Sequence, residues 1–128
     1  MNRLAVCILL SLGLVSCSDQ GPSIEGRWGW FNIENCEGDL DAIEFSRTEF
    51  FHRRNGEILV SGTDLAYQVS DAEEGPRTTA IYRIADRVLT LTFETQGTDV
   101  LIFRGATTNG QTSPAVANFL ERELFRCE

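Results

Sequence analysis

Few residues of this 128-residue chain have the types and spacing that catalysis requires. His52 is the only histidine, and it lies between two phenylalanines and two arginines in the segment FFHRR. The sequence contains no Gly-x-Ser-x-Gly nucleophile motif. Among its carboxylates, Glu73 and Glu74 lie in a polar loop, and Glu121 and Glu123 lie near Arg122 and Arg126 in the C-terminal segment, which is typical of a solvated surface. We therefore predict that the protein is not an enzyme and binds no metal or cofactor, because neither a catalytic constellation nor a ligand set is present.

The two tryptophans are the residues best suited to binding. They lie two positions apart in the segment Gly26-Arg27-Trp28-Gly29-Trp30. In a β-strand this spacing places both indoles on the same face. Such side chains either fill a core or line a binding surface, and the surrounding elements decide which.

The N-terminal segment has the pattern of a secretory signal. Residues 1–16 carry one positive charge at Arg3, followed by an apolar run without acidic residues. The run is shorter than the roughly 20 residues that span a bilayer, so a cleaved signal is favoured over a membrane helix. It ends in Leu14-Val15-Ser16-Cys17, which resembles the lipobox of bacterial lipoproteins. The resemblance implies cleavage before Cys17 and lipid attached to its sulfur and its new N-terminus.

This resemblance also implies a place in the bacterial cell envelope. Several acyl chains would hold the protein on a membrane permanently, since each buried methylene contributes about 0.8 kcal/mol. Ser18 follows the lipidated cysteine, where an aspartate would often mean retention in the inner membrane of a Gram-negative cell. We therefore expect the outer membrane, facing the periplasm. Residues 17–23 would form the lipidated N-terminus and a short polar tether, and residues 24–128 the folded domain.

The cysteines and the charge fit this expectation. With Cys7 lost and Cys17 lipidated, Cys36 and Cys127 remain as an even pair in an oxidising compartment, and we expect a disulfide between them. Removal of residues 1–16 takes away one arginine and no acid, so the net charge changes from −8 to −9. Such a charge repels nucleic acid and anionic headgroups, which excludes a nucleic-acid partner.

Residues 24–104 are a succession of short segments with period-2 alternation separated by turn residues, which is typical of an all-β sandwich or barrel. Asn55-Gly56 indicates a tight hairpin, because both positions tolerate positive φ. Gly62-Thr63-Asp64 is interpreted as another turn. We expect eight strands, at residues 24–30, 43–45, 50–53, 57–61, 65–69, 79–84, 87–93 and 99–104.

The C-terminal segment changes to helical spacing. Ser113-Pro114 is typical of a helix start, with serine as N-cap and proline at the first helical position. One apolar stripe then follows, at Val116, Phe119, Leu120, Leu124 and Cys127. We expect an α-helix of about 13 residues, which is too short to be stable alone and must pack on the sheet.

A small eight-stranded antiparallel up-and-down barrel would remove exposed strand edges by closure. Gly26-Arg27-Trp28 resembles the Gly-x-Trp of the first strand in lipocalin-like proteins, and Arg104 is placed like the arginine that packs over that tryptophan. The resemblance implies a lipocalin-like barrel closed at one end by Trp28 and Arg104. A β-sandwich or half-open barrel stays open as an alternative.

Two functions follow from such a barrel. An interior of this size is either filled or holds one small ligand. A hollow interior would be lined by Trp30, Phe45, Tyr67 and Tyr82, and the protein would bind a small apolar ligand without catalysis. The alternative is an interaction or inhibitor module that presents the acidic segments 37–41 and 71–75 to a basic protein partner.

Overall fold

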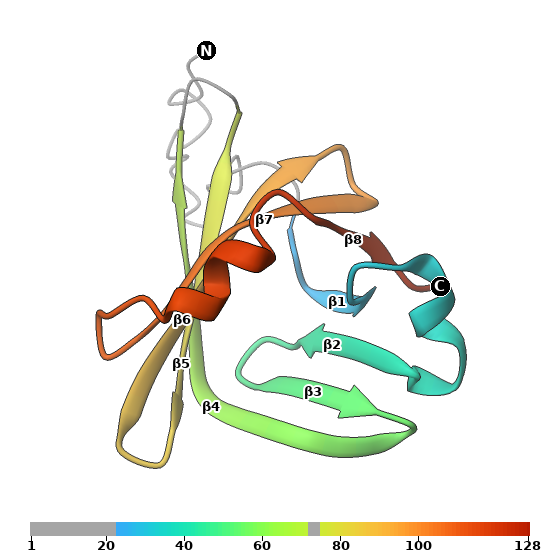
Figure 1. The fold of residues 1–128 in the computed structure, drawn as a ribbon, viewed down its shortest axis with the longest axis horizontal. Coiled ribbons are helices and arrows are strands. Elements are labelled where there is room, and N and C mark those ends of the chain that lie inside the picture. The colour runs from blue at the N-terminus through green and yellow to red at the C-terminus, as the bar shows by residue number, and fades with distance from the viewer. Residues whose placement is uncertain (1–22, 72–74) are drawn as a thin grey trace, which may run out of the picture.

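The computed structural model describes residues 23–71 and 75–128. The predicted signal peptide and Cys17 lie outside the described residues. Within them, eight strands form a closed barrel in which each strand pairs antiparallel with the next and the last returns to the first (Figure 1). No helix of this part of the chain has the length and apolar character needed to cross a membrane.

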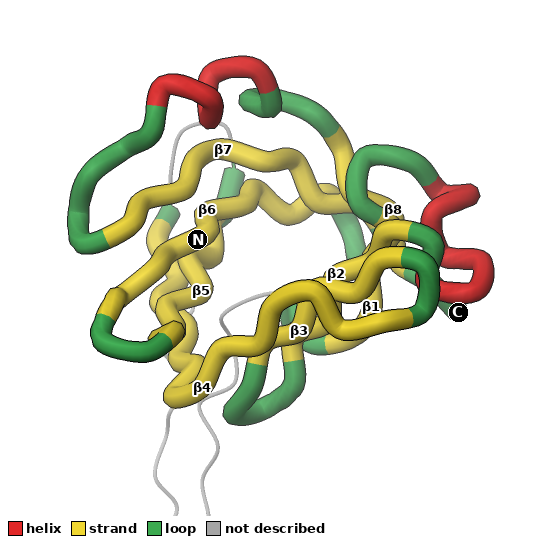
Figure 2. Tube along the Cα trace, turned by 60° about the horizontal axis from the view of Figure 1, so that its bottom comes forward, coloured by secondary structure: helices red, strands yellow, loops and turns green. Residues whose placement is uncertain are grey.

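Within residues 23–71 and 75–128, two short 3-10 helices accompany the strands. η2 (Ile33–Asp39) follows the first strand, and η3 (Pro114–Asn118) precedes the last. Figure 2 shows η3 beside β7, and η2 beside β1 near the C-terminus. The strands are β1 (Gly26–Gly29), β2 (Asp41–Phe45), β3 (Phe50–Arg54), β4 (Glu57–Ser70), β5 (Arg77–Ile84), β6 (Arg87–Gln96), β7 (Val100–Thr108) and β8 (Glu123–Arg126).

The predicted all-β barrel of eight antiparallel strands is confirmed, but one predicted turn is wrong. Residues 57–61 and 65–69 belong to the single strand β4 and are not divided at residues 62–64. Asp64 has a φ of 56°, and the register with β5 shifts between Thr63 and Ala66. Such an irregularity bends a strand without reversing it. The first half of β4 therefore pairs with β3 and the second half with β5 (Figure 1).

The predicted C-terminal α-helix is also wrong. Only η3 is helical, and the Ser113 hydroxyl caps it by accepting from the Ala115 N–H, as the Ser-Pro pair predicts. Glu121 then has a φ of 68°, which no helix continues through. The chain goes on as β8, which pairs with both β7 and β1. Without β8 these two strands would have unpaired edges, so closure of the barrel outweighs the helical spacing of the apolar residues.

Side chains fill the interior. The Phe45 ring centroid lies 5.4 Å from that of Phe50 and 5.8 Å from that of Phe93. Tyr82 stacks on Phe50 with ring centroids 4.4 Å apart. Six large side chains have less than 2% of their surface exposed: Trp28, Phe45, Phe93, Ile43, Leu101 and Leu124.

The cation over Trp28 comes from a different strand than expected. The Arg126 guanidinium carbon lies 4.3 Å from the Trp28 ring centroid, and Trp28 and Arg126 are direct partners across β1 and β8. Arg104, on β7, forms ion pairs with Glu94 and Glu121. The predicted Trp28–Arg104 contact is therefore wrong, because β8 lies between β7 and β1. The closing role assigned to Arg104 belongs to Arg126.

The disulfide between Cys36 and Cys127 is confirmed, with an S–S distance of 2.03 Å. It joins η2 to the residue that follows β8. The Cys127 N–H also donates to the Arg27 carbonyl at 2.8 Å. The two contacts together hold the end of the chain against β1.

One glycine of the barrel allows a close packing contact that can be tested. A Cβ at Gly62 would lie 2.4 Å from Cδ2 of Tyr82, whose ring is held by its stacking on Phe50. We expect Gly62→Ala to lower the free energy of unfolding by about 1 to 3 kcal/mol, measured by urea denaturation. Gly105→Ala in β7 is the matched control, because a Cβ there meets no atom within 4 Å, and its effect should stay below about 0.5 kcal/mol. Equal stabilities of the two variants would contradict the contact.

Candidate functional site

The four residues predicted to line a cavity lie in two places. Phe45 and Tyr82 are buried in the core, and Tyr67 packs against Phe45 with ring centroids 6.4 Å apart. Tyr67 donates its hydroxyl to the Ser46 carbonyl at 2.7 Å. Burial raises the pKa of both tyrosine phenols, and the negative charge of Glu25 adds to the rise at Tyr67. These three side chains are neutral packing groups. Tyr67 and Trp30 are both partly exposed, and Trp30 lines a larger hollow than Tyr82 does.

Trp30 stands where β1 ends and the chain turns into η2. Its backbone N–H donates to the Asp41 carbonyl at 2.9 Å, so the ladder with β2 extends to this residue. Its carbonyl accepts from the Asn35 side-chain amide at 2.8 Å. Asn32 caps η2 by accepting from the Glu34 N–H at 2.8 Å. The backbone of Trp30 is therefore fixed by hydrogen bonds on both sides.

A hollow of about 390 Å³ opens beside Trp30. We call it the Trp30 pocket. It takes residues from the turn after β1, from η2, from the β2–β3 hairpin and from the segment between η3 and β8. Its lining residues are Trp30, Phe31, Asn32, Asn35, Asp41, Arg54, Phe119 and Arg122.

Three aromatic rings pack one against the next at the pocket, with Trp30 tilted by 31° to Phe31 and Phe31 stacked on Phe119. The ring centroids of Trp30 and Phe31 are 4.4 Å apart, and Phe31 lies nearly parallel to Phe119 at 5.4 Å. The Arg122 guanidinium carbon lies 4.6 Å from the Phe31 ring centroid. Phe119 is 37% exposed. The pocket therefore presents apolar ring surface to solvent at a concave place.

Phe31 has a backbone conformation that is uncommon for its residue type. Its φ is 68°, in the left-handed region that bulky side chains avoid. This conformation costs on the order of 1 to 3 kcal/mol and persists only where the surroundings hold it. Here the bonds of Trp30 to its neighbours and the stacking on Phe119 hold it. Strained residues of this kind cluster at binding sites.

The polar side of the pocket centres on Asp41. Its carboxylate lies 2.6 Å from Nε2 of His52 and 3.8 Å from the guanidinium of Arg54. The His52 ring lies beneath Trp30, with ring centroids 5.8 Å apart. Asp41 and Arg54 are direct partners across β2 and β3. The His52 ring, which Asp41 holds, thus packs near the indole, while the Arg54 side chain, 52% exposed, faces solvent.

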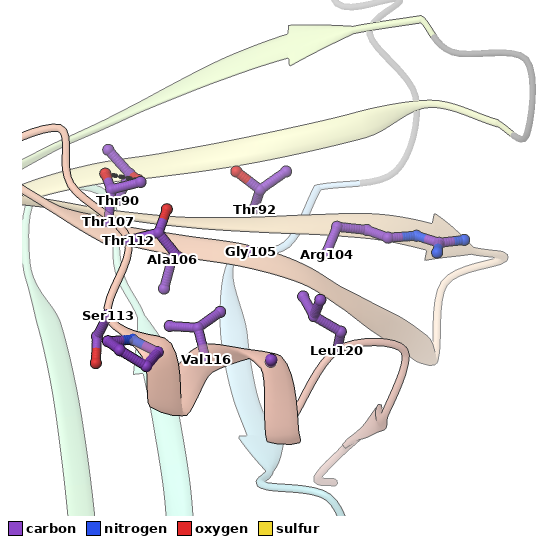
Figure 3. Close-up of a pocket in the computed structure, with 12 residues that line it drawn as sticks. Thr90, Thr92, Arg104, Gly105, Ala106, Thr107, Thr112, Ser113, Val116 and Leu120 are labelled. Carbon is purple, nitrogen blue, oxygen red and sulfur yellow. Dashed lines mark hydrogen bonds between the residues drawn. The ribbon is translucent and has the colours of Figure 1, made fainter.

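A second groove lies between η3 and the β6–β7 pair, with a volume of about 390 Å³ (Figure 3). Val116 and Leu120 point from the η3 segment towards the sheet. The hydroxyls of Thr90 and Thr107 are 2.7 Å apart and satisfy each other. The one charged lining residue, Arg104, is paired with carboxylates. This groove therefore offers fewer groups to a ligand than the Trp30 pocket does.

The acidic segments give less support to a basic partner. In the segment 37–41, Asp39 pairs with Arg27, and Asp41 pairs with His52. Residues 72–74 of the second segment lie outside the described residues. Two of the acids that would face a partner are thus already in contact with basic side chains of the molecule.

Sequence reasoning found only part of the pocket. The sequence predicts Trp30 as a lining residue, and it offers His52 only as a candidate for catalysis. Phe31, Phe119 and Arg122 were missed, because they meet only when β8 closes the barrel. The hairpin around Asn55-Gly56 was the available signal for Arg54, since it fixes the register of β3 with its neighbours.

Comparison of the chain with models of protein families, with curated proteins and with solved structures finds no match.

Proposed function

We propose that this protein is a non-catalytic binding module held on the bacterial cell envelope by lipid on Cys17, facing the periplasm. The lipobox-like segment Leu14-Val15-Ser16-Cys17 and the signal-like run before it support the anchor. A lipocalin-like relationship is part of the proposal. Its support is the consecutive antiparallel strand order and the covering of Trp28 by an arginine of the last strand.

The ligand is a small molecule with an apolar body, and it binds at the Trp30 pocket rather than inside the barrel. The observation that carries this proposal is the stack of Trp30, Phe31 and Phe119 beside a hollow. Apolar surface covered by a ligand gains roughly 25 cal/mol for each Å² removed from water. The packed rings of Phe45, Phe50 and Tyr82 favour the surface site over the interior.

Replacing Trp30 by alanine tests this proposal. The probe is 1-naphthaleneacetamide, a neutral molecule with a flat apolar body, titrated by calorimetry into the full chain carrying Cys17→Ser so that no lipid is attached. We expect Trp30→Ala to weaken binding at least about tenfold, since a stacked aromatic contact and its buried area are lost. The control is Tyr82→Phe, which removes one buried hydroxyl in the core and should leave the dissociation constant unchanged. Loss of binding in Tyr82→Phe but not in Trp30→Ala would return the site to the interior.

A further inference from the structure

The charges around the Trp30 pocket differ from those of the rest of the molecule. The chain has 19 acidic and 11 basic residues, so its surface is acidic overall. The pocket lining has two arginines, Arg54 and Arg122, against one carboxylate, Asp41. Asp41 is moreover in contact with His52. The pocket is therefore locally positive on an acidic protein.

The guanidinium N–H donors of Arg122 are available to a ligand. Among the described residues its guanidinium meets the ring of Phe31 and no carboxylate within ion-pair distance. By contrast, Arg27 and Arg53 are committed to Asp39 and Glu44. A guanidinium has five N–H donors in a planar fork that fits a carboxylate. Stacking on Phe31 holds that fork at the rim of the pocket without using its donors.

Arg54 is the second arginine of the pocket whose N–H donors are available to a ligand. Its contact with Asp41, at 3.8 Å, is longer than a direct hydrogen bond, and half of its side chain is exposed. A ligand that binds the Arg54 guanidinium therefore displaces no short hydrogen bond. Both arginines belong to the same hollow as the stacked rings, so one small molecule can meet rings and guanidinium groups together.

From this arrangement we infer that the ligand is a small carboxylic acid whose apolar body lies on the aromatic stack and whose carboxylate is bound by Arg54 and Arg122. The inference rests on the proposed function and names its ligand class. A monoanion fits better than a dianion such as phosphate, because the two arginines and Asp41 leave one positive charge, and Asp41 repels a dianion more strongly. The aromatic surface explains why the ligand also has an apolar part.

A pair of probes of the same shape tests the inference. 1-Naphthaleneacetate and 1-naphthaleneacetamide have the same apolar body and differ in the charge of the head group. Titrated into the full chain carrying Cys17→Ser, the acid should bind at least about tenfold more tightly than the amide, as expected for a charge-assisted hydrogen bond. The dissociation constant of the amide divided by that of the acid should fall when sodium chloride is raised from about 0.05 to 0.5 M, because the pocket is open to solvent.

Variants locate the effect. In Arg122→Gln and in Arg54→Gln the amide-to-acid ratio of dissociation constants should fall towards one. Two positions are tested because replacing Arg122 alone could also shift Phe31, whereas Arg54 does not contact that ring. Arg87→Gln removes the same charge from an exposed position at the start of β6 and should keep the full ratio. Equal binding of acid and amide to the unaltered pocket, or a ratio that survives both replacements together, would overturn the inference and leave the proposed function standing. Binding of neither probe would overturn the proposed function and the inference with it.

Discussion

Replacing Cys36 and Cys127 together by serine should lower the free energy of unfolding by about 4 to 5 kcal/mol. The two residues are 91 positions apart, so the bond restricts nearly the whole folded chain in the unfolded state. The native state depends on it as well, because β1 and β8 pair through only two residue pairs, Trp28 with Arg126 and Gly29 with Phe125. A loss of this size is a large part of the 5 to 15 kcal/mol that stabilises a typical small domain.

Urea denaturation of the full chain carrying Cys17→Ser measures the effect, with intrinsic tryptophan fluorescence as the signal. The same protein reduced with dithiothreitol is the control, and it should lose as much stability as the double replacement. If the double replacement costs less than about 1 kcal/mol, the short pairing of β1 with β8 suffices without the bond. If reduction costs much less than the replacement, the serines themselves disturb the packing of Cys127 beside β1.

The features that the sequence predicts correctly are local or depend on simple counting. Period-2 alternation identifies the sheet class, because neighbouring side chains of a strand face opposite sides whatever their partners are. Asn55-Gly56 identifies its hairpin, and both residues have positive φ, 54° and 81°. The disulfide follows from two remaining cysteines. None of these needs the three-dimensional arrangement of the strands.

The β4 error arises because a turn and a bulge use the same residue types. Gly62 and Asp64 suit either, since glycine packs closely and aspartate tolerates positive φ. Only the pairing partners distinguish a turn from a bulge. Here β3 pairs with the first half of β4 and β5 pairs with its second half, so the strand is continuous. The choice between Arg104 and Arg126 over Trp28 fails for a similar reason, because it depends on which strand closes the barrel.

The Trp30 pocket shows a similar limit at the level of function. Trp30 is a candidate binding residue because it is a tryptophan, but its neighbours in the pocket come from segments far apart in the sequence. The sequence pattern predicts Phe119 in a helical stripe, whereas in the structure it stacks on Phe31. The positive φ of Phe31 could not be predicted from the sequence, because phenylalanine rarely adopts this conformation. A binding site of this kind is visible only after the barrel has closed.

Leu124→Ala should lower the free energy of unfolding by about 2 to 5 kcal/mol, the range for removing a fully buried leucine. Leu124 is 0% exposed and belongs to β8, opposite Leu101 of β7. Leu120→Ala is the matched control. Leu120 is 42% exposed and lies on the groove between η3 and the β6–β7 pair, so its replacement should cost less, about 1 kcal/mol or below.

The comparison separates a strand from a helix at the C-terminus, because Leu120 and Leu124 are four positions apart. On an α-helix packed against the sheet they would share one buried face, and both replacements would destabilise the protein by similar amounts. In the barrel only Leu124 points into the core. Urea denaturation of the two variants therefore gives unequal losses if β8 closes the barrel. Equal large losses would instead support a C-terminal helix. The edges of β1 and β7 would then have to be covered in another way.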